Sequence, residues 1–338
     1  MTTESTRDNA PMYMARYAQR KAEGAISPIE VASSEPPFIA RARARAAKRA
    51  LVEMELGSSP PGRTIAFANE TVAPRELQYP DSFRHRVATS VDVRLIRHGQ
   101  TQGYISDGAL TPLGRWQAHR KGADLAKGLK EGMVVKFPHA PTARAKETAD
   151  GVRGGVLSSL SRYGIGDVTV EDPEPNAAFD NFQVCVNGKE MDVTAAFLEF
   201  ANVREGYNRY GSGDRPGWMV EIDRFFRVEQ GGGDPITHWL SHPMQYFEPS
   251  ALVVRRYWKG IVALTRSCDP NTKIYVCAHS GPIRAVATSA VGHDPGEPHN
   301  TEDVRIKVYD DFEHAVVTYR GRGTEIEIPT SVTPSWYA

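Results

Sequence analysis

The chain has 338 residues, of which 41 are basic, 41 are acidic and 40% are hydrophobic. A chain of this length can bury a substantial core, and its balanced charge gives no bias toward nucleic acid or an anionic membrane. We therefore expect neither a nucleic-acid partner nor a membrane partner. No apolar stretch approaches the ~18 residues of a membrane span, and the three cysteines lack a metal-site spacing. These features predict a cytoplasmic protein with free thiols.

The first part of the chain is predicted to be an N-terminal extension, residues 1–88. Residues 1–35 are polar and aperiodic, which predicts partial disorder, whereas residues 39–56 are rich in Ala, Arg, Glu and Leu and favour a helical arm. We expect this arm to pack on the following domain, because its acidic residues offset part of its basic charge. A nucleic-acid arm and a dimerisation element are the alternatives, so a homodimer stays open.

From residue 91 onward, predicted strands and helices alternate. Apolar runs at 91–96, 133–137 and 274–278 predict strands, and Thr111-Pro112 and Glu248-Pro249 have the residue types that begin helices. Residues 304–309, 315–319 and 325–328 predict strands that complete one edge of the sheet. The alternation predicts a three-layer α/β/α domain over residues 89–330, with a mostly parallel central sheet and helices on both faces, followed by a tail at 331–338.

Each of the three apolar strands is followed by charged or titratable groups. Open α/β sheets bind their ligands at the carboxyl ends of parallel strands, so these groups are expected at one edge. A histidine beside fixed cations at that edge predicts a phosphate-handling site. The groups are Arg97-His98-Gly99 after the first strand, Arg144 after the second, and His279-Ser280-Gly281 after the third.

Four segments resemble, in order and spacing, the histidine phosphatase superfamily, also called phosphoglycerate-mutase-like. The resemblance covers roughly residues 91–320 and implies the phosphoglycerate-mutase-like fold. The segments are Arg97-His98-Gly99-x-Thr101, Leu110-Thr111-x-x-Gly114-x-x-Gln117-Ala118, Arg144-Ala145-x-x-Thr148-Ala149 and His279-Ser280-Gly281.

The chemistry gives physical reasons for these residue types. A neutral imidazole is a good nucleophile, and His98 could attack a phosphoryl group to form a phosphohistidine. Arg97 and Arg144 would clamp the phosphoryl oxygens, and His279 would complete the pocket. Because these cations supply the charge, we expect no metal and no other cofactor. Further substrate-binding groups are predicted at Thr101, Tyr104, Ser280 and Gly281.

The chain departs from the family pattern at two positions. The resemblance places a general acid, usually a glutamate, shortly after the predicted strand at 168–171, and Asp180 is the residue available there. Its shorter side chain changes the reach of the acid; the fallback acids are Glu174, Glu199 and Glu205. Many family members have asparagine where Tyr104 stands, which reshapes the predicted pocket and puts the usual substrates in doubt.

The stretch from 181 to 247 is longer and more irregular than an ordinary connection, and we expect it to act as a lid over the substrate pocket. His238 and His242 lie at i and i+4 within it, but a metal site would need a further ligand.

The leading hypothesis is a metal-independent phosphatase that hydrolyses a small phosphorylated metabolite through a phosphohistidine on His98. A phosphomutase would use the same residues and exclude water. A noncatalytic phosphate-binding or scaffold protein is the alternative from another class, although binding alone does not require a placed nucleophile.

Overall fold

A seven-stranded sheet forms the centre of the part of the chain that the structure describes. The computed structural model describes residues 90–101, 108–209 and 215–329. The predicted N-terminal extension, the tail at 331–338 and Tyr104 lie outside these residues. In the sheet the strands have the order β3-β2-β6-β1-β7-β8-β9.

The sheet has a parallel core and an antiparallel edge. β1 pairs in parallel with β6, β6 with β2, and β2 with β3, whereas β7, β8 and β9 are antiparallel. The predicted parallel centre and the predicted edge strands are both confirmed. The strands are β1 (Val91–Arg97), β2 (Val134–His139), β3 (Thr169–Pro175), β6 (Thr272–Ala278), β7 (Asp303–Val308), β8 (His314–Tyr319) and β9 (Arg322–Glu327).

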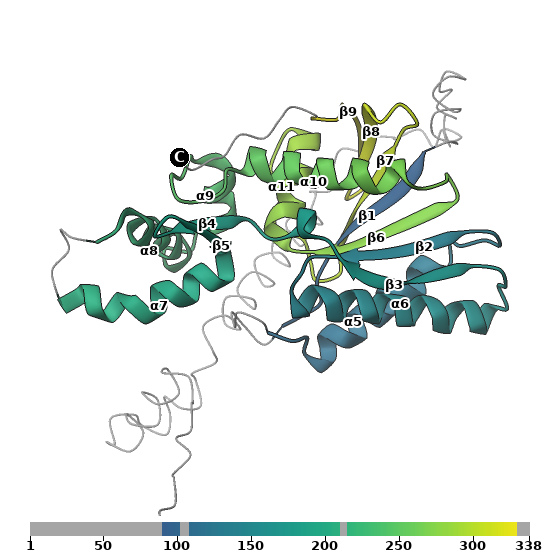
Figure 1. Ribbon diagram of the computed structural model, residues 1–338, viewed down its shortest axis with the longest axis horizontal. Coiled ribbons are helices and arrows are strands. Elements are labelled where there is room, and N and C mark those ends of the chain that lie inside the picture. The colour runs from purple at the N-terminus through teal and green to yellow at the C-terminus, as the bar shows by residue number, and fades with distance from the viewer. Residues whose placement is uncertain (1–89, 102–107, 210–214, 330–338) are drawn as a thin grey trace, which may run out of the picture. The chain divides into compact units, whose positions relative to one another are not determined.

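Helices cover both faces of this sheet, as predicted (Figure 1). On one face lie α5 (Pro112–Ala126) and α6 (Ala143–Tyr163), and on the other lie α10 (Ser250–Arg266) and α11 (Ser280–Val291). Val93 and Leu95 of β1 belong to the core under α10 and α11, and Ile96 belongs to the core under α5 and α6. Because both faces are covered, β6 reads as a nearly continuous apolar run, whereas Asp92 and Arg94 alternate with the apolar residues of β1.

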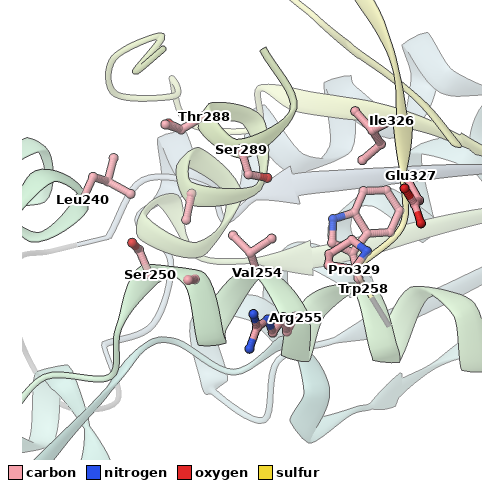
Figure 2. Close-up of a pocket in the computed structure, with 12 residues that line it drawn as sticks. Leu240, Ser250, Val254, Arg255, Trp258, Thr288, Ser289, Ile326, Glu327 and Pro329 are labelled. Atoms are coloured by element: carbon pink, nitrogen blue, oxygen red, sulfur yellow. The ribbon is translucent and has the colours of Figure 1, made fainter. Parts of the chain in front are cut away.

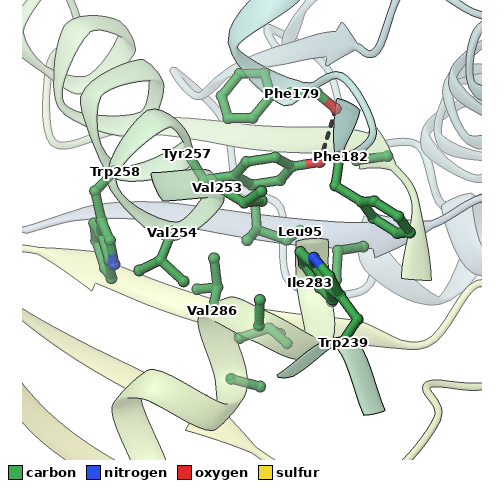
Figure 3. Close-up of a cluster of buried hydrophobic side chains, with 14 of the residues drawn as sticks. Leu95, Phe179, Phe182, Trp239, Val253, Val254, Tyr257, Trp258, Ile283 and Val286 are labelled. Carbon is green, nitrogen blue, oxygen red and sulfur yellow. Dashed lines mark hydrogen bonds between the residues drawn. The ribbon is translucent and has the colours of Figure 1, made fainter. Parts of the chain in front are cut away.

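The core under α10 also holds the backbone next to the predicted acid in place (Figure 3). Tyr257 of α10 is fully buried, and its hydroxyl donates a hydrogen bond of 2.7 Å to the carbonyl of Phe179. The two rings meet edge to face with centroids 5.5 Å apart. Phe179 ends a short 3-10 helix, η1 (Ala177–Phe179), directly before Asp180. The core therefore fixes the backbone at the predicted acid.

The region from 181 to 247 is more regular than the sequence suggested, and the prediction of an irregular excursion was wrong. It contains a hairpin, β4 (Gln183–Val186) and β5 (Lys189–Asp192), and three helices: α7 (Val193–Arg209), α8 (Gly217–Gln230) and α9 (Pro235–Ser241). Asn187 and Gly188 form the hairpin turn with φ values of 51° and 76°, the left-handed conformation that two-residue hairpins favour. Its role as a lid stays a prediction.

Within the described residues, no helix is long and apolar enough to cross a membrane.

Candidate active site

The ends of β1, β2 and β6 bring four of the predicted side chains together. The rings of His98 and His279 lie with their centroids 5.5 Å apart and their planes at 65°. Arg144, at the start of α6, donates from Nε to His279 Nδ1 over 3.3 Å. Arg97 and Arg144 are both close enough to act electrostatically on the two imidazoles.

Two glycines and a threonine hold the turn that follows β1. The amide of Gly99 donates to the hydroxyl of Thr148 over 3.0 Å, and Thr148 is fully buried on α6. A Cβ on Gly99 would lie 2.5 Å from the carbonyl oxygen of Gly114, and a Cβ on Gly114 would lie 2.2 Å from that of Gln100. Backbone therefore packs against backbone where the turn meets the start of α5, and larger residues would displace His98.

The ring of His98 is oriented by its neighbour. Nδ1 lies 2.8 Å from the carbonyl oxygen of Gly99, and a carbonyl can only accept, so Nδ1 carries the proton and Nε2 keeps its lone pair. Burial, together with the positive charges of Arg97 and Arg144, lowers the pKa of His98 to about 3 despite the opposing hydrogen bond. His98 is thus a neutral imidazole at neutral pH.

His279 is also held neutral. It is 2% exposed, and burial, followed by the charge of Arg144, keeps its pKa well below the ordinary value. Its Nε2 lies 3.4 Å from the hydroxyl of Thr142. Arg144 donates in addition to the hydroxyl of Thr194 over 3.3 Å, so the guanidinium is fixed by contacts on both sides.

Arg97 is positioned by the loop between α11 and β7. Its NH1 atom forms an ion pair of 3.0 Å with Glu297 and donates to the carbonyl of Pro298. Its Nε is buried and has no partner among the described residues. The same loop supplies Asn300, whose side chain donates to the carbonyl of His98 over 3.1 Å.

Asp180 lies in the same electrostatic neighbourhood, since Arg144 acts on its carboxyl group. Burial raises its pKa, the charge of Asp192 adds to this rise, and a hydrogen bond from the amide of Asn181 opposes it. A carboxyl group with a raised pKa stays partly protonated at higher pH, which suits a proton donor.

Arg256 of α10 holds the backbone around Asp180. Its guanidinium donates to the carbonyls of Ala178, Asp180 and Asn181 at 3.2, 2.9 and 2.9 Å. It also forms two hydrogen bonds, of 3.1 and 2.9 Å, with the buried carboxylate of Glu248. Five bonds from one planar group make this segment rigid.

The remaining predicted residues divide into three groups. Ser280 and Gly281 lie at the start of α11, next to His279, and Thr101 pairs with Leu110 through a single bridge. Of the fallback acids, Glu174 is exposed on β3, Glu199 is half-buried on α7, and the side chain of Glu205 lies outside what the structure describes. Tyr104 lies outside the described residues.

The sequence did not single out several groups around the cluster. Asp192, at the end of β5, accepts from the amide of Thr194 at Oδ1 over 2.8 Å, whereas its Oδ2 is buried and has no partner among the described residues. Burial raises the pKa of Asp180 and the charge of Asp192 adds to this rise, so a second carboxylate lies near the predicted acid. The others are Thr142, Thr194, Arg256 and Asn300.

No group of three or more His, Cys, Asp and Glu side chains that could hold a metal ion occurs in the described part of the chain. His238 and His242 stack with their ring centroids 4.4 Å apart at the end of α9, and the structure places no third ligand with them.

The structure has a larger cavity away from the histidine cluster and a smaller cavity beside it. One of about 460 Å³ lies between α10, α11 and the end of β9, and it is lined by residues such as Val254, Trp258 and Ser289 rather than by the histidine cluster (Figure 2). The other, of about 140 Å³, is smaller but lies against the cluster, because Arg97, Ser280 and Gly281 form part of its wall. Size alone therefore does not identify the candidate active site.

Comparison with known proteins gives matches among solved structures. A mycobacterial glucosyl-3-phosphoglycerate phosphatase in complex with VO3 is 17% identical, with 67% of this chain and 96% of that chain covered and a TM-score of 0.39. YhfR of Bacillus stearothermophilus is 16% identical, with 72% and 98% covered and a TM-score of 0.40. Phosphoserine phosphatase of Entamoeba histolytica in complex with 3-phosphoglyceric acid is 18% identical, with 68% and 95% covered and a TM-score of 0.34.

These solved structures are members of the histidine phosphatase superfamily. No family model matches the chain, and no curated protein sequence matches it.

Proposed function

We propose that this chain is a phosphatase of the histidine phosphatase type, which hydrolyses a small phosphorylated molecule through a phosphohistidine on His98. The observation that carries the proposal is the gathering of two neutral imidazoles and two guanidinium groups from three strand ends. An unprotonated Nε2 beside fixed cations suits attack on a phosphoryl group, because phosphoryl transfer depends on positioning and on positive charge.

The proposed reaction has two steps. In the first, the lone pair of His98 Nε2 forms a bond to phosphorus, the ester P–O bond breaks, and Asp180 gives its proton to the leaving oxygen. In the second, a water oxygen forms a bond to phosphorus, the P–N bond breaks, and Asp180 takes a proton from the water. Inorganic phosphate leaves, and both groups return to their starting states. Arg97 and Arg144 would bind the phosphoryl oxygens throughout.

The experiment that tests this function is chemical trapping of the intermediate. We expect rapid quenching with a ³²P-labelled phosphomonoester to give an acid-labile, base-stable label on His98, and His98→Asn to abolish both the label and the release of phosphate. His119→Asn is the matched control, because His119 is exposed on α5 beside Ser158 of α6, which is not part of the cluster, and the variant should keep full activity. Turnover unchanged in His98→Asn would exclude the proposal.

The role of Asp180 is tested separately. Asp180→Asn removes the proton donor and is expected to lower kcat/KM by about 10²–10⁴-fold for alkyl phosphates. We compare kcat/KM because it reports the steps up to phosphorylation of His98 and leaves out the hydrolysis step that all substrates share. An activated aryl phosphate, whose leaving group needs no proton, should lose far less. If both substrates lose activity equally, Asp180 is not the general acid, and Asp192→Asn becomes the next variant to measure.

A further inference from the structure

The cavity of about 140 Å³ beside Arg97 has one wall of apolar side chains from the region 181–247, and Asn181 and Ser280 add polar groups next to Arg97. Phe197 comes from α7, Phe225 and Phe226 come from α8, and Ile236 comes from α9. Phe182, which is 3% exposed, closes the side next to Gly281, where an added Cβ would lie 2.9 Å from its ring.

The phenylalanines pack as one preformed cluster. The ring centroids of Phe197 and Phe226 are 4.8 Å apart, and those of Phe197 and Phe225 are 5.4 Å apart. Phe225 is buried, whereas Phe197 and Phe226 are only half-buried and so keep surface for a ligand. Mutual contact restricts these side chains, so little ordering is required when a ligand binds.

The charges that line the cavity disfavour a second anion. Its only cation among the described residues is Arg97, and Glu297 already forms an ion pair of 3.0 Å with it. Glu229, on the last turn of α8, adds another carboxylate to the lining and is exposed. Glu297 also pairs with Arg284 over 3.5 Å, so a carboxylate or second phosphate on the substrate would be repelled mainly by Glu229.

We propose that the substrate is a monophosphate ester of an uncharged, apolar alcohol of about one ring in size. Its phosphoryl group binds at the histidine and arginine cluster, and its apolar group binds against Phe197, Phe225 and Phe226. This inference rests on the proposed function. The volume of about 140 Å³ leaves room for about one ring, since a closed apolar cavity of about 150 Å³ holds benzene.

The test compares primary-alcohol phosphates, so that leaving groups have similar strength. We expect kcat/KM for benzyl phosphate to exceed that for glycerol 1-phosphate and glucose 6-phosphate by at least about tenfold, the low end of what a single apolar group contributes in a fitted pocket. Adding a carboxylate, as in 4-carboxybenzyl phosphate, is expected to remove this advantage. A preference for glycerol 1-phosphate or glucose 6-phosphate would overturn the inference.

Two variants of the cavity sharpen the test. Phe226→Ala should lower kcat/KM for benzyl phosphate about tenfold or more relative to kcat/KM for glycerol 1-phosphate, whereas Leu157→Ala, an exposed apolar truncation on α6, should not change this ratio. Glu229→Gln should raise turnover of 4-carboxybenzyl phosphate relative to benzyl phosphate. If Phe226→Ala does not fold, the Glu229→Gln variant provides the test. Equal effects of Glu229→Gln on benzyl phosphate and 4-carboxybenzyl phosphate would refute the proposed substrate class.

Failure of this inference is distinguishable from failure of the proposed function. If no phosphomonoester is hydrolysed and His98 is never phosphorylated, the function itself is wrong. If His98 is phosphorylated but the polar esters are preferred, the catalytic proposal stands and only the substrate class is wrong.

Discussion

Replacing Arg256 with lysine should show how strongly the segment around Asp180 depends on one side chain. Arg256 makes five hydrogen bonds to three carbonyls and one carboxylate. A lysine has three donors, so at least two bonds are lost even in the best geometry. Bonds to charged groups contribute about 1.5–3 kcal/mol each, and we therefore expect Arg256→Lys to lower the free energy of unfolding by at least about 3 kcal/mol.

Calorimetry and kinetics together provide the assay. For a domain of this size, about 3 kcal/mol corresponds to a fall in Tm of roughly 6–12 °C. A displacement of Asp180 by about 1 Å can cost about 10²-fold in rate, so kcat/KM for alkyl phosphates should fall strongly. An activated aryl phosphate should be less affected, because its leaving oxygen needs no proton. A purely structural role would lower both activities together.

Arg305→Lys is the matched control. Arg305 forms two hydrogen bonds with Asp92, at 3.2 and 2.7 Å, on the strand pair β1 and β7, and its side chain is 41% exposed. Asp92 is buried, but a lysine keeps a positive charge beside it and Lys273 pairs with the same carboxylate, so this variant should lower Tm less than Arg256→Lys and leave kcat unchanged. The reasoning about Arg256 fails if its lysine variant has the Tm of the wild type, or if alkyl and aryl phosphates lose activity in equal proportion.

Two further predictions concern the histidine cluster. Thr148→Val leaves the buried amide of Gly99 without its acceptor, which should cost about 1–3 kcal/mol in urea unfolding and lower kcat; a Tm equal to that of the wild type would contradict this. The lowered pKa values of His98 and His279 mean that the unfolded chain binds more protons below pH ~6.5. Stability should therefore rise from acid pH up to ~6.5 and then level off, by up to about 1.4 kcal/mol per pH unit for each histidine. His98→Asn should flatten this slope, and an unchanged slope would count against a buried neutral imidazole.

The central sheet could be predicted because its signals are local. The end of β6 is a continuous apolar run since both of its faces are covered, and β1 has apolar residues at four of its seven positions. Thr111 caps α5 by accepting from the amide of Gly114 over 2.9 Å. The site followed from the same signals, because the ends of parallel strands meet at one edge.

The region 181–247 was misjudged for a different reason. The Asn187-Gly188 pair is a strong hairpin signal, but the strands on each side have only four residues, too few for a clear alternation. The role of Arg256 could not be predicted, because its partners near Asp180 are backbone carbonyls about 75 residues away in sequence. Every residue has a backbone carbonyl, so the sequence does not show which carbonyls a distant side chain will contact.

The positive charges of the cluster affect both the binding of phosphate and the protonation of His98. Arg97 and Arg144 disfavour a proton on His98 by the same positive charge that would attract a phosphoryl dianion. A cluster with the imidazole alone would lose part of its nucleophile to protonation in mild acid, and a cluster with the guanidinium groups alone would bind phosphate without transferring it. Because both cations act on the same ring, removing either one should weaken phosphate binding and raise the pKa of His98 together. A variant that changed only one of these properties would show that the arginines act on separate sites.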